Sequence, residues 1–264
     1  MDHLTRLENE SIFILRQAYS SIKNIAMLWS LGKDSNVMIW LAFKAFLGKV
    51  PFPVVHVDTK KKFLQMYKFR NKYSKIWNLN LVIGNCPTID SIDPSLPPAA
   101  RSAARKTEGL KKIIHEKKFR GLIAGIRRDE QNTRAKERFF SPRDESGKWN
   151  IINQPAELWN SYNTDYPSNV HIRIHPLLSW TEIDIWRYIK RENIPIVDLY
   201  YSNKGFRYRS LGDKDITSPV KSKAKTVDQI IEELEKTNTT ERSGRLMDKE
   251  EENVFEKLRS RGYL

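Results

Sequence analysis

Cysteine is almost absent from this chain, because Cys86 is the single cysteine among 264 residues. One thiol excludes an internal disulfide and a zinc site made of four thiolates. It also leaves the C-terminal half without a thiol, which counts strongly against enzymes that carry a cysteine nucleophile there. Cys86 is followed by a proline, and we expect this thiol to pack rather than to react.

Long apolar runs are also missing. No stretch approaches the ~18 consecutive apolar residues of a membrane-spanning helix, and the opening MDHLTRLENE is too polar for a signal peptide. We therefore expect a soluble, cytoplasmic protein that does not bind a membrane. Hydrophobic residues make up 39% of the sequence. This fraction is sufficient for the core of one α/β domain of about 250 residues, with or without an appendage.

Acidic residues are in the minority, 32 against 46 basic residues, so the formal net charge is +14. A basic chain favours an anionic partner, which can be a nucleotide, an inorganic oxyanion, an acidic protein or a nucleic acid. Histidine is scarce too, with five in the chain. His171 and His175 alternate with apolar residues as in a strand, but the sequence places no third ligand beside them. We therefore expect no metal site at these histidines.

A short polar stretch, SLGKDS at residues 30–35, separates two apolar segments. Residues 25–29 have the apolar character of a strand covered on both faces, and residues 37–43 that of a buried helix. A loop between them brings backbone N–H groups together with the positive end of the helix dipole. Gly32 allows close approach and Lys33 adds a cation. We expect a phosphate site rather than a plain surface turn, although the stretch is not a Walker A loop.

Apolar segments and helical patterns alternate along the chain up to about residue 124. This alternation predicts an α/β fold with a doubly wound, mainly parallel sheet. Ligands of such sheets bind beyond the carboxyl ends of the strands, so the segments that follow the strands should converge on one site. Those segments are residues 30–35, 56–59 and 125–129. Strands are expected at residues 25–29, 52–57, 79–83 and 121–124, helices at residues 61–77 and around residues 110–114, and a proline-rich loop at residues 90–100.

The last part of the chain has a different character. Thr181 begins a capping-box pattern before apolar residues at helical spacing, and Thr226 begins a second one. Residues 205–225 between them are basic and are expected to form an irregular loop, and a last helix is expected from Asp248. We divide the chain into an ATP-binding α/β domain and an appendage that packs on it or on a partner, at residues 1–200 and 201–264.

Long blocks of the sequence occur in a characteristic order: LTRLENESIFILRQA, SLGKDSNVMIWLAFKAF, PFPVVHVDT, KTEGLKK, GIRRDEQNTRAKERFFSPRD, PAELWNSYN, HPLLSWTEIDIWRYI, RYRSLGD and ERSGRLMD. Together they resemble the small-subunit family of bacterial sulfate adenylyltransferase, also called ATP sulfurylase. The resemblance runs nearly from end to end. That family has the PP-loop fold that it shares with the adenylylsulfate and phosphoadenylylsulfate reductases.

The resemblance implies that ATP is cleaved between its α and β phosphates, while pyrophosphate stays on the loop and sulfate accepts AMP. Sulfate is ionised at neutral pH and needs no general base, so alignment and charge neutralisation suffice for catalysis. The catalytic residues implied are Lys33, Asp34, Arg127 and Arg128. The ATP-binding residues implied are Ser30, Leu31, Gly32, Ser35, His56, Asp58, Thr59, Gly125, Arg134 and Arg138.

Two of these assignments leave alternatives open. The arginines of the GIRRDEQNTRAKER block have planar forks that match oxyanions. We expect Arg127 and Arg128 at the sulfate and the transferring phosphate, and Asp129, Glu130 and Glu137 in pairs with the other cations of the block. The alternative is a solvated charge run. Asp58 ends a strand, where a carboxylate can bind the adenine amino group, hold Mg²⁺, or cap the next helix.

The resemblance also implies a heterodimer with a large GTPase subunit of elongation-factor type. The amphipathic C-terminal helices and the basic residues 205–225 offer surface for such a partner, or merely cover the sheet. Nucleic acid is not an expected partner, because net charge is the single feature that favours it.

Three features depart from the family pattern. Lys60 and Lys61 stand where the family has Gly and Trp, Asp213 stands where it has Cys, and the segment between residues 201 and 207 is shorter. They keep three alternatives open. The first is a reductase of adenylylsulfate or phosphoadenylylsulfate, the second a tRNA-modifying adenylating enzyme, and the third a nucleotide-binding subunit without turnover. The sequence does not decide whether the product serves cysteine synthesis or sulfation.

Overall fold

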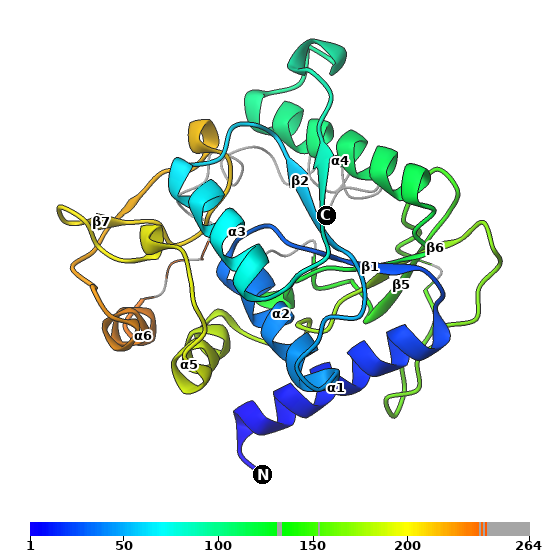
Figure 1. Ribbon diagram of the computed structural model, residues 1–264, viewed down its shortest axis with the longest axis horizontal. Helices are drawn as coiled ribbons and strands as arrows, with labels where there is room; N and C mark the ends of the chain where they lie inside the picture. The colour runs from blue at the N-terminus through cyan, green and yellow to red at the C-terminus, as the bar shows by residue number, and fades with distance from the viewer. Residues whose placement is uncertain (131–133, 153, 238, 240, 242–264) are drawn as a thin grey trace.

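The computed structural model describes residues 1–130, 134–152, 154–237, 239 and 241. Its centre is a six-stranded sheet with the strand order β3-β2-β1-β4-β6-β5 (Figure 1). Neighbouring strands pair in parallel except β5, which runs antiparallel to β6 at one edge. The strands are β1 (Ile25–Leu28), β2 (Val54–Asp58), β3 (Leu81–Asn85), β4 (Gly121–Ile123), β5 (Phe140–Arg143) and β6 (His171–Ile174).

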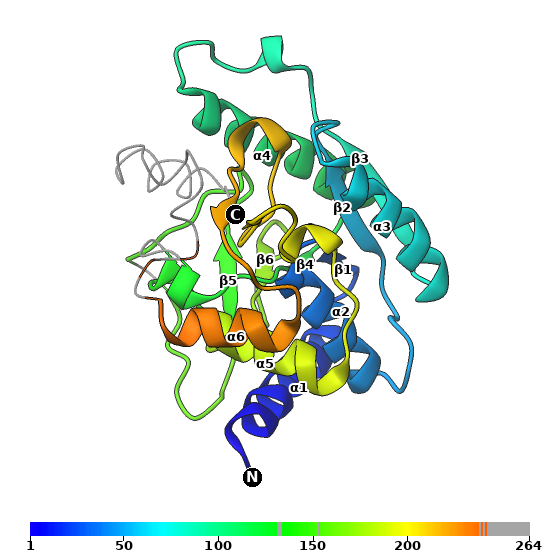
Figure 2. The same ribbon diagram turned by 90° about the vertical axis from the view of Figure 1, so that its left-hand side faces the viewer.

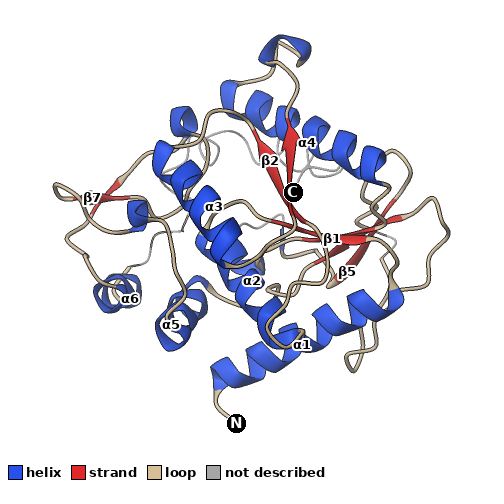
Figure 3. Cartoon of the chain, viewed as in Figure 1, coloured by secondary structure: helices blue, strands red, loops and turns tan. Residues whose placement is uncertain are grey.

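Helices cover both faces of this sheet (Figure 3). They are α1 (His3–Ser21), α2 (Lys33–Ala45), α3 (Leu64–Ile76), α4 (Pro98–Lys117), α5 (Glu182–Glu192) and α6 (Val227–Glu235). Successive side chains of a strand point to opposite faces. Met27 of β1 accordingly packs into the core formed with α1, α2, α3 and α5, whereas its neighbour Ala26 packs with the apolar side of α4.

The chain changes direction across the sheet beside β1. After β1 it adds β2 and β3 on one side, and it then returns to pair β4 with the other side of β1. In open α/β sheets such a reversal creates a crevice at the carboxyl ends of the strands, where ligands bind. The residues that follow β1, β2 and β4 therefore share one edge of the sheet.

The predicted fold class is confirmed, and each of the four predicted strands corresponds to one of β1 to β4. The proline-rich loop expected at residues 90–100 was partly wrong, because α4 begins at Pro98. Proline suits the first turn of a helix, where a backbone N–H has no acceptor within the helix. The α2 helix also begins earlier than the apolar run suggested, at Lys33. The edge strand β5 was not expected, because Phe-Ser-Pro-Arg is too short and polar to show a strand period.

The described part of the appendage lies against the α/β domain, with α6 beside α5 (Figure 2). Both predicted helix starts are confirmed, since Thr181 caps α5 in a full capping box and Thr226 caps α6. Residues 205–225 are largely irregular, as expected, except for a short antiparallel pair, β7 (Phe206–Arg207) and β8 (Val220–Lys221), and a 3-10 turn at Lys214–Ile216. The helix predicted from Asp248 lies outside the described residues. Within the described ranges, no helix has the length and apolar character needed to cross a membrane.

Candidate functional site

The turn between β1 and α2 sets a helix N-terminus at the edge of the sheet. Gly32 is the N-cap residue, and Leu31 before it adopts the left-handed backbone conformation with a φ of 68°. The Leu31 side chain is buried in the core, which anchors a turn that an L-residue enters at a cost in free energy. Ser30 donates a hydrogen bond from Oγ to Ser35 Oγ at 3.1 Å, and Ser35 donates to the Gly32 carbonyl at 2.9 Å. Such a helix start favours an anion.

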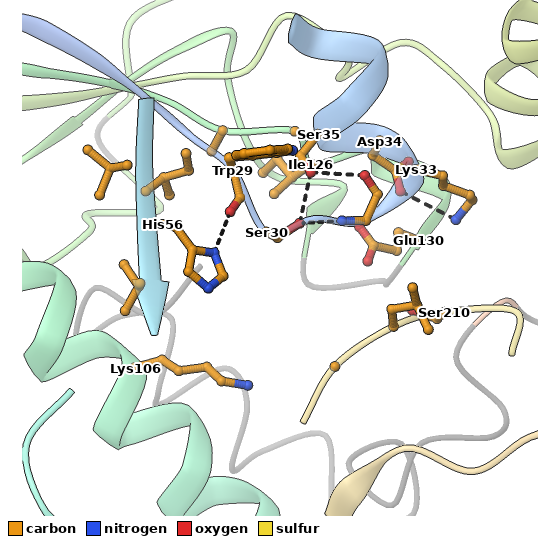
Figure 4. Close-up of a pocket in the computed structure, with 18 of the residues that line it drawn as sticks. Trp29, Ser30, Lys33, Asp34, Ser35, His56, Lys106, Ile126, Glu130 and Ser210 are labelled. Carbon is orange, nitrogen blue, oxygen red and sulfur yellow. Dashed lines mark hydrogen bonds and ion pairs between the residues drawn. The ribbon is translucent and has the colours of Figure 1, made fainter. Parts of the chain in front are cut away.

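A pocket opens at this turn, beyond the carboxyl ends of β1, β2 and β4 (Figure 4). Eight of the residues predicted for the site line it: Ser30, Gly32, Lys33, Asp34, Ser35, His56, Gly125 and Arg134. Other lining residues come from α4, from the segment after α5 and from the end of the described chain. Those that sequence reasoning missed include Lys62, Lys106, Thr107, Tyr200, Ser210 and Glu241.

Lys33 and Arg127 form a buried charge cluster with three carboxylates. The Lys33 ammonium pairs with Glu241 and lies 3.3 Å from Asp34. Arg127 pairs with Asp34 and Glu241, and its Nε lies 2.9 Å from Asp129. The Lys33 and Arg127 side chains are 1% and 0% exposed. Ion pairs so far from water depend on good partners, because an unpaired charge there is costly.

Glu241 brings an anion from the end of the described chain into this cluster. Burial would raise the pKa of Glu241, but the positive charges of Lys33 and Arg127 outweigh burial and lower that pKa to about 2. The side chain is therefore ionised at neutral pH. The Glu241 carboxylate pairs with Lys33, next to the loop that is expected to hold pyrophosphate. An anionic ligand therefore has to share Lys33 with this carboxylate or displace it.

The two adjacent arginines of the GIRRDE block point to different places. Arg127 lies behind Asp34 and does not line the pocket. Arg128 lies over the Phe139 ring, 5.4 Å from its centroid, and donates to the Glu137 carbonyl at 3.3 Å. Arg138 donates to the Pro155 carbonyl at 3.3 Å. None of the three is among the lining residues, so their contacts to sulfate or phosphate remain predictions. Arg134 does line the pocket and pairs with Glu130.

Asp58 does not line the pocket, and its carboxylate is already occupied. Oδ1 accepts hydrogen bonds from Lys60 N at 2.7 Å and Tyr67 Oη at 2.9 Å, and Oδ2 accepts from Arg70 at 3.2 Å. Burial raises the pKa of Asp58, but the hydrogen bonds from Lys60 and Tyr67 outweigh burial and lower it. These contacts tie the end of β2 to the body of α3, but Asp58 does not cap that helix, whose N-cap residue is Phe63 without a side-chain hydrogen bond. They do not fit Mg²⁺, and the described residues contain no group of three His, Cys, Asp or Glu side chains that could hold a metal.

At the other end of the pocket, Asp213 accepts hydrogen bonds and ion pairs from two segments, the loop after β2 and α4. It accepts from Thr59 Oγ1 at 2.7 Å and Ser102 Oγ at 2.8 Å, and it pairs with Lys62 at 3.1 Å and Lys106 at 2.8 Å. Burial would raise the pKa of Asp213, but the two lysines hold it well below its usual range. Thr59, predicted to bind ATP, therefore positions Asp213 and does not line the pocket.

Two of the three departures from the family pattern, Lys60–Lys61 and Asp213, lie in segments that contact each other. Lys60 has a φ of 59°, the left-handed conformation that glycine enters most readily. The Lys61 ammonium lies 2.5 Å from Asp215, and the Lys61 carbonyl accepts from Lys214 N at 2.8 Å. The segment after β2 is therefore joined to residues 213–215 both here and through Asp213.

His56 lines the pocket with a buried side chain that is 1% exposed. Its Nδ1 lies 2.9 Å from the Trp29 carbonyl oxygen, and its Nε2 has no hydrogen-bond partner among the described residues. Burial is the main cause that lowers the pKa of His56 to about 4, so the ring is neutral at physiological pH.

Lys106 and Glu241 were missed, and Asp213 was named only as a departure from the family pattern, because no local pattern marks them as site residues. Glu241 lies 208 positions from Lys33 in the sequence, and Asp213 lies 111 positions from Ser102. One signal was available: Lys106 and Glu241 stand in the KTEGLKK and ERSGRLMD blocks, which carry the family resemblance.

Comparison with known proteins gives concordant results. Residues 24–219 match the family model described as the phosphoadenosine phosphosulfate reductase domain. A sulfate adenylyltransferase subunit 2 from Sulfurimonas denitrificans is 39% identical in an alignment that covers 100% of this chain and 98% of that protein. The protein of the same name from Bacteroides fragilis is 38% identical with the same coverage.

Solved structures with a similar fold are more distant in sequence. An FMN adenylyltransferase from Candida glabrata, in complex with FMN and the ATP analogue AMPCPP, has a TM-score of 0.55 and 20% identity. The match covers 82% of this chain and 65%, less than two thirds, of that one. A phosphoadenylyl-sulfate reductase from Candida auris, in a phosphate complex, has a TM-score of 0.52 and 17% identity, covering 81% of this chain and 95% of that one. The chain has their fold, and its sequence shows that it belongs to the sulfate adenylyltransferase subunit 2 family, within the phosphoadenosine phosphosulfate reductase domain group.

Proposed function

We propose that this chain transfers the adenylyl group of ATP to sulfate, giving adenylylsulfate and pyrophosphate. The observation that carries the proposal is the pocket at the start of α2, where Lys33 and the amides of a buried helix N-terminus meet. This arrangement suits a polyphosphate. Family membership supports the choice of sulfate as acceptor, because the relatives bear the name sulfate adenylyltransferase subunit 2.

The chemistry requires alignment and charge neutralisation rather than proton abstraction. Sulfate is already ionised at neutral pH, so its oxygen attacks the α phosphorus without a base, and pyrophosphate leaves. Negative charge then accumulates on the leaving group, which Lys33 and the helix start would stabilise. Ser30 and Ser35 can donate hydrogen bonds to the same oxygens, and the far end of the pocket supplies the ammonium groups of Lys62 and Lys106.

A thiol-dependent reductase fits the chain less well. The single thiol, Cys86, follows β3 and packs against α4, where a Cβ on Gly109 would lie 3.0 Å from its sulfur. Burial raises the pKa of Cys86, which lowers its thiolate fraction. Cys86 is not among the residues that line the pocket. A nucleotide-binding subunit without turnover remains the second candidate, because the Lys60, Lys61 and Asp213 departures adjoin the pocket.

The decisive measurement is ATP–pyrophosphate exchange that depends on sulfate. We expect exchange by the wild type, its loss in Lys33→Ala, and its retention in Lys23→Ala, which removes an exposed lysine outside the pocket. Cys86→Ser should also retain exchange. ATP binding without sulfate-dependent exchange would favour the subunit without turnover, and loss of exchange in Cys86→Ser would revive a thiol mechanism.

A partner subunit is part of the proposal. The product contains a phosphoric–sulfuric anhydride whose hydrolysis is more favourable than that of the ATP bond broken, so the isolated reaction runs toward ATP. A catalyst cannot shift that equilibrium, and forward flux needs product removal or coupled energy. The name subunit 2 of the relatives implies a further subunit, and we propose that this subunit is a large GTPase that supplies the energy. Adenylylsulfate formation by this chain alone, unaffected by GTP or by that partner, would contradict the heterodimer.

Magnesium is expected with ATP, yet the described side chains offer no place for it at Asp58. Mg²⁺ in nucleotide sites is commonly held by the substrate's phosphates and water, with one or two carboxylates. The carboxylates that line the pocket, Asp34, Glu130 and Glu241, are all engaged in ion pairs. We therefore assign no protein ligand to Mg²⁺.

A further inference from the structure

His56 of β2 has a defined tautomer. Its Nδ1 lies 2.9 Å from the carbonyl oxygen of Trp29. A carbonyl oxygen accepts hydrogen bonds and never donates, so Nδ1 must carry the hydrogen. In a neutral imidazole the second nitrogen, Nε2, is then a lone-pair acceptor. The strand therefore places a hydrogen-bond acceptor of fixed orientation at the pocket wall.

The acceptor is buried and directed into the cavity. His56 lines the pocket, and Nε2 has no hydrogen-bond partner among the described residues. Figure 4 shows the ring bonded to the Trp29 carbonyl on one side, with its other nitrogen facing the open space toward Lys106. A buried acceptor without a donor carries a free-energy penalty, and a ligand that supplies the donor removes it.

The ring is held neutral by its surroundings. Burial is the largest cause that lowers the pKa of His56, and the positive charges of Lys62 and Arg70 lower it further. The Trp29 carbonyl and Asp58 act in the opposite direction but do not outweigh burial. His56 consequently does not offer a second N–H to a phosphate near neutral pH.

Because Nε2 is a hydrogen-bond acceptor, it can bind only a part of the nucleotide that carries a hydrogen-bond donor. Phosphate and sulfate oxygens are acceptors at neutral pH and do not match it. The donors on ATP are the 6-amino group of adenine and the two ribose hydroxyls. Resting on the proposed function, in which this pocket binds ATP, we propose that His56 determines nucleoside specificity by accepting a hydrogen bond from one of these donors.

The test uses variants that separate the two ring nitrogens. His56→Asn keeps an amide that can donate to the Trp29 carbonyl and removes the acceptor at the Nε2 position. His56→Gln extends an amide oxygen toward that position and should restore part of the effect. His171→Asn is the matched control, because His171 also has Nδ1 against a carbonyl, that of Phe119 at 3.2 Å, yet does not line the pocket.

Dissociation constants of ATP, ITP, 2′-deoxy-ATP and 3′-deoxy-ATP are measured by calorimetry, with pyrophosphate as the probe of the loop alone. In the wild type and in His171→Asn, we expect one analogue to bind at least ~10-fold more weakly than ATP. If ITP is the weakly bound analogue, the donor to His56 is the 6-amino group of adenine. If a deoxynucleotide is the weakly bound analogue, the donor is the hydroxyl that it lacks. In His56→Asn the same analogue and ATP should bind equally, with the affinity for pyrophosphate unchanged.

Equal binding of all four nucleotides to the wild type would overturn the inference without any variant. An unchanged ratio in His56→Asn, with intact pyrophosphate binding, would overturn it as well. Neither result affects sulfate-dependent exchange, which tests the proposed function separately. Conversely, nucleotide discrimination lost in His56→Asn supports the role of His56 even if exchange is absent.

Discussion

The two ends of the pocket balance charge in opposite ways. At the loop end, Lys33 and Arg127 contact three carboxylates, Asp34, Asp129 and Glu241. At the far end, two lysines converge on the single carboxylate of Asp213. At the loop end, the Glu241 carboxylate thus already lies where pyrophosphate is expected. At the far end, Lys62 and Lys106 surround the buried carboxylate of Asp213. Changing a residue at either end should therefore have different consequences for stability and for ligand binding.

The largest effect is expected from Arg127→Met. This change leaves three carboxylates next to Lys33 alone in a buried site, and breaking a buried ion pair from one side costs about 3–5 kcal/mol of unfolding free energy. Urea unfolding of Arg127→Met and of Arg6→Met, which alters an exposed arginine, measures the difference. A stability loss no greater than that of Arg6→Met would show that Arg127 does not hold the loop end together.

Asp213→Asn tests the far end and should cost slightly less, about 2–4 kcal/mol, because the single amide oxygen still accepts from one of the two hydroxyls, Thr59 or Ser102. Because the pKa of Asp213 is depressed in the folded state, its contribution is present above the unfolded value of about 3.9 and is lost as the pH falls below it. Acid unfolding of the variant should therefore be less steep than that of the wild type. Asp198→Asn, at an exposed aspartate, is the control, and equal behaviour of the two variants would contradict the buried cluster.

Glu241→Gln distinguishes the two ends through ligand binding. Removal of the internal anion should destabilise the ligand-free protein, because Lys33 and Arg127 lose a charged partner. Pyrophosphate should then bind more tightly, by roughly 10-fold, since it no longer competes with a carboxylate. Calorimetry with pyrophosphate and thermal unfolding with and without it measure both effects. Glu232→Gln serves as control, and unchanged or weaker pyrophosphate binding in Glu241→Gln would mean that Glu241 orients Lys33 instead of competing.

The smallest effect is expected at Lys60. An L-residue in the left-handed conformation is strained, and glycine relieves this strain while adding unfolded-state entropy. Lys60→Gly should therefore stabilise the protein by about 0.5 kcal/mol. The same substitution at Lys68, an exposed residue inside α3, should destabilise it by about 1 kcal/mol. Urea unfolding of the pair gives the sign directly, and destabilisation by Lys60→Gly would show that the lysine side chain contributes more than the strain costs.

The elements around the site were predictable from the sequence because their causes are local. Asp2 caps α1 by accepting from Thr5 N at 2.8 Å, and Thr181 and Asp184 form the capping box of α5. The apolar run after residue 36 is buried as α2. Apolar periodicity and helix capping involve residues that are only a few positions apart in the chain. Both can therefore be recognised in the sequence itself.

The positions of single side chains were decided by the tertiary structure. Arg127 and Arg128 are consecutive and of the same residue type, so the sequence does not distinguish them. In the structure, Arg127 joins the charge cluster and Arg128 lies over the Phe139 ring. Asp58 ends its strand as predicted, but Tyr67 and Arg70 of α3 take its oxygens. The direction of an arginine or a carboxylate depends on which remote partners the packed chain brings within hydrogen-bond distance.

The sequence by itself determined that a turn with Gly32 and Lys33 follows β1 and leads into a buried helix, because strand, turn and helix are contiguous. It did not show that the acid facing Lys33 is Glu241, 208 positions away, or that Asp213 joins Lys62 of one segment to Lys106 of another. Charges attract according to distance in space, and the reversal of the chain beside β1 sets those distances only after the sheet has assembled.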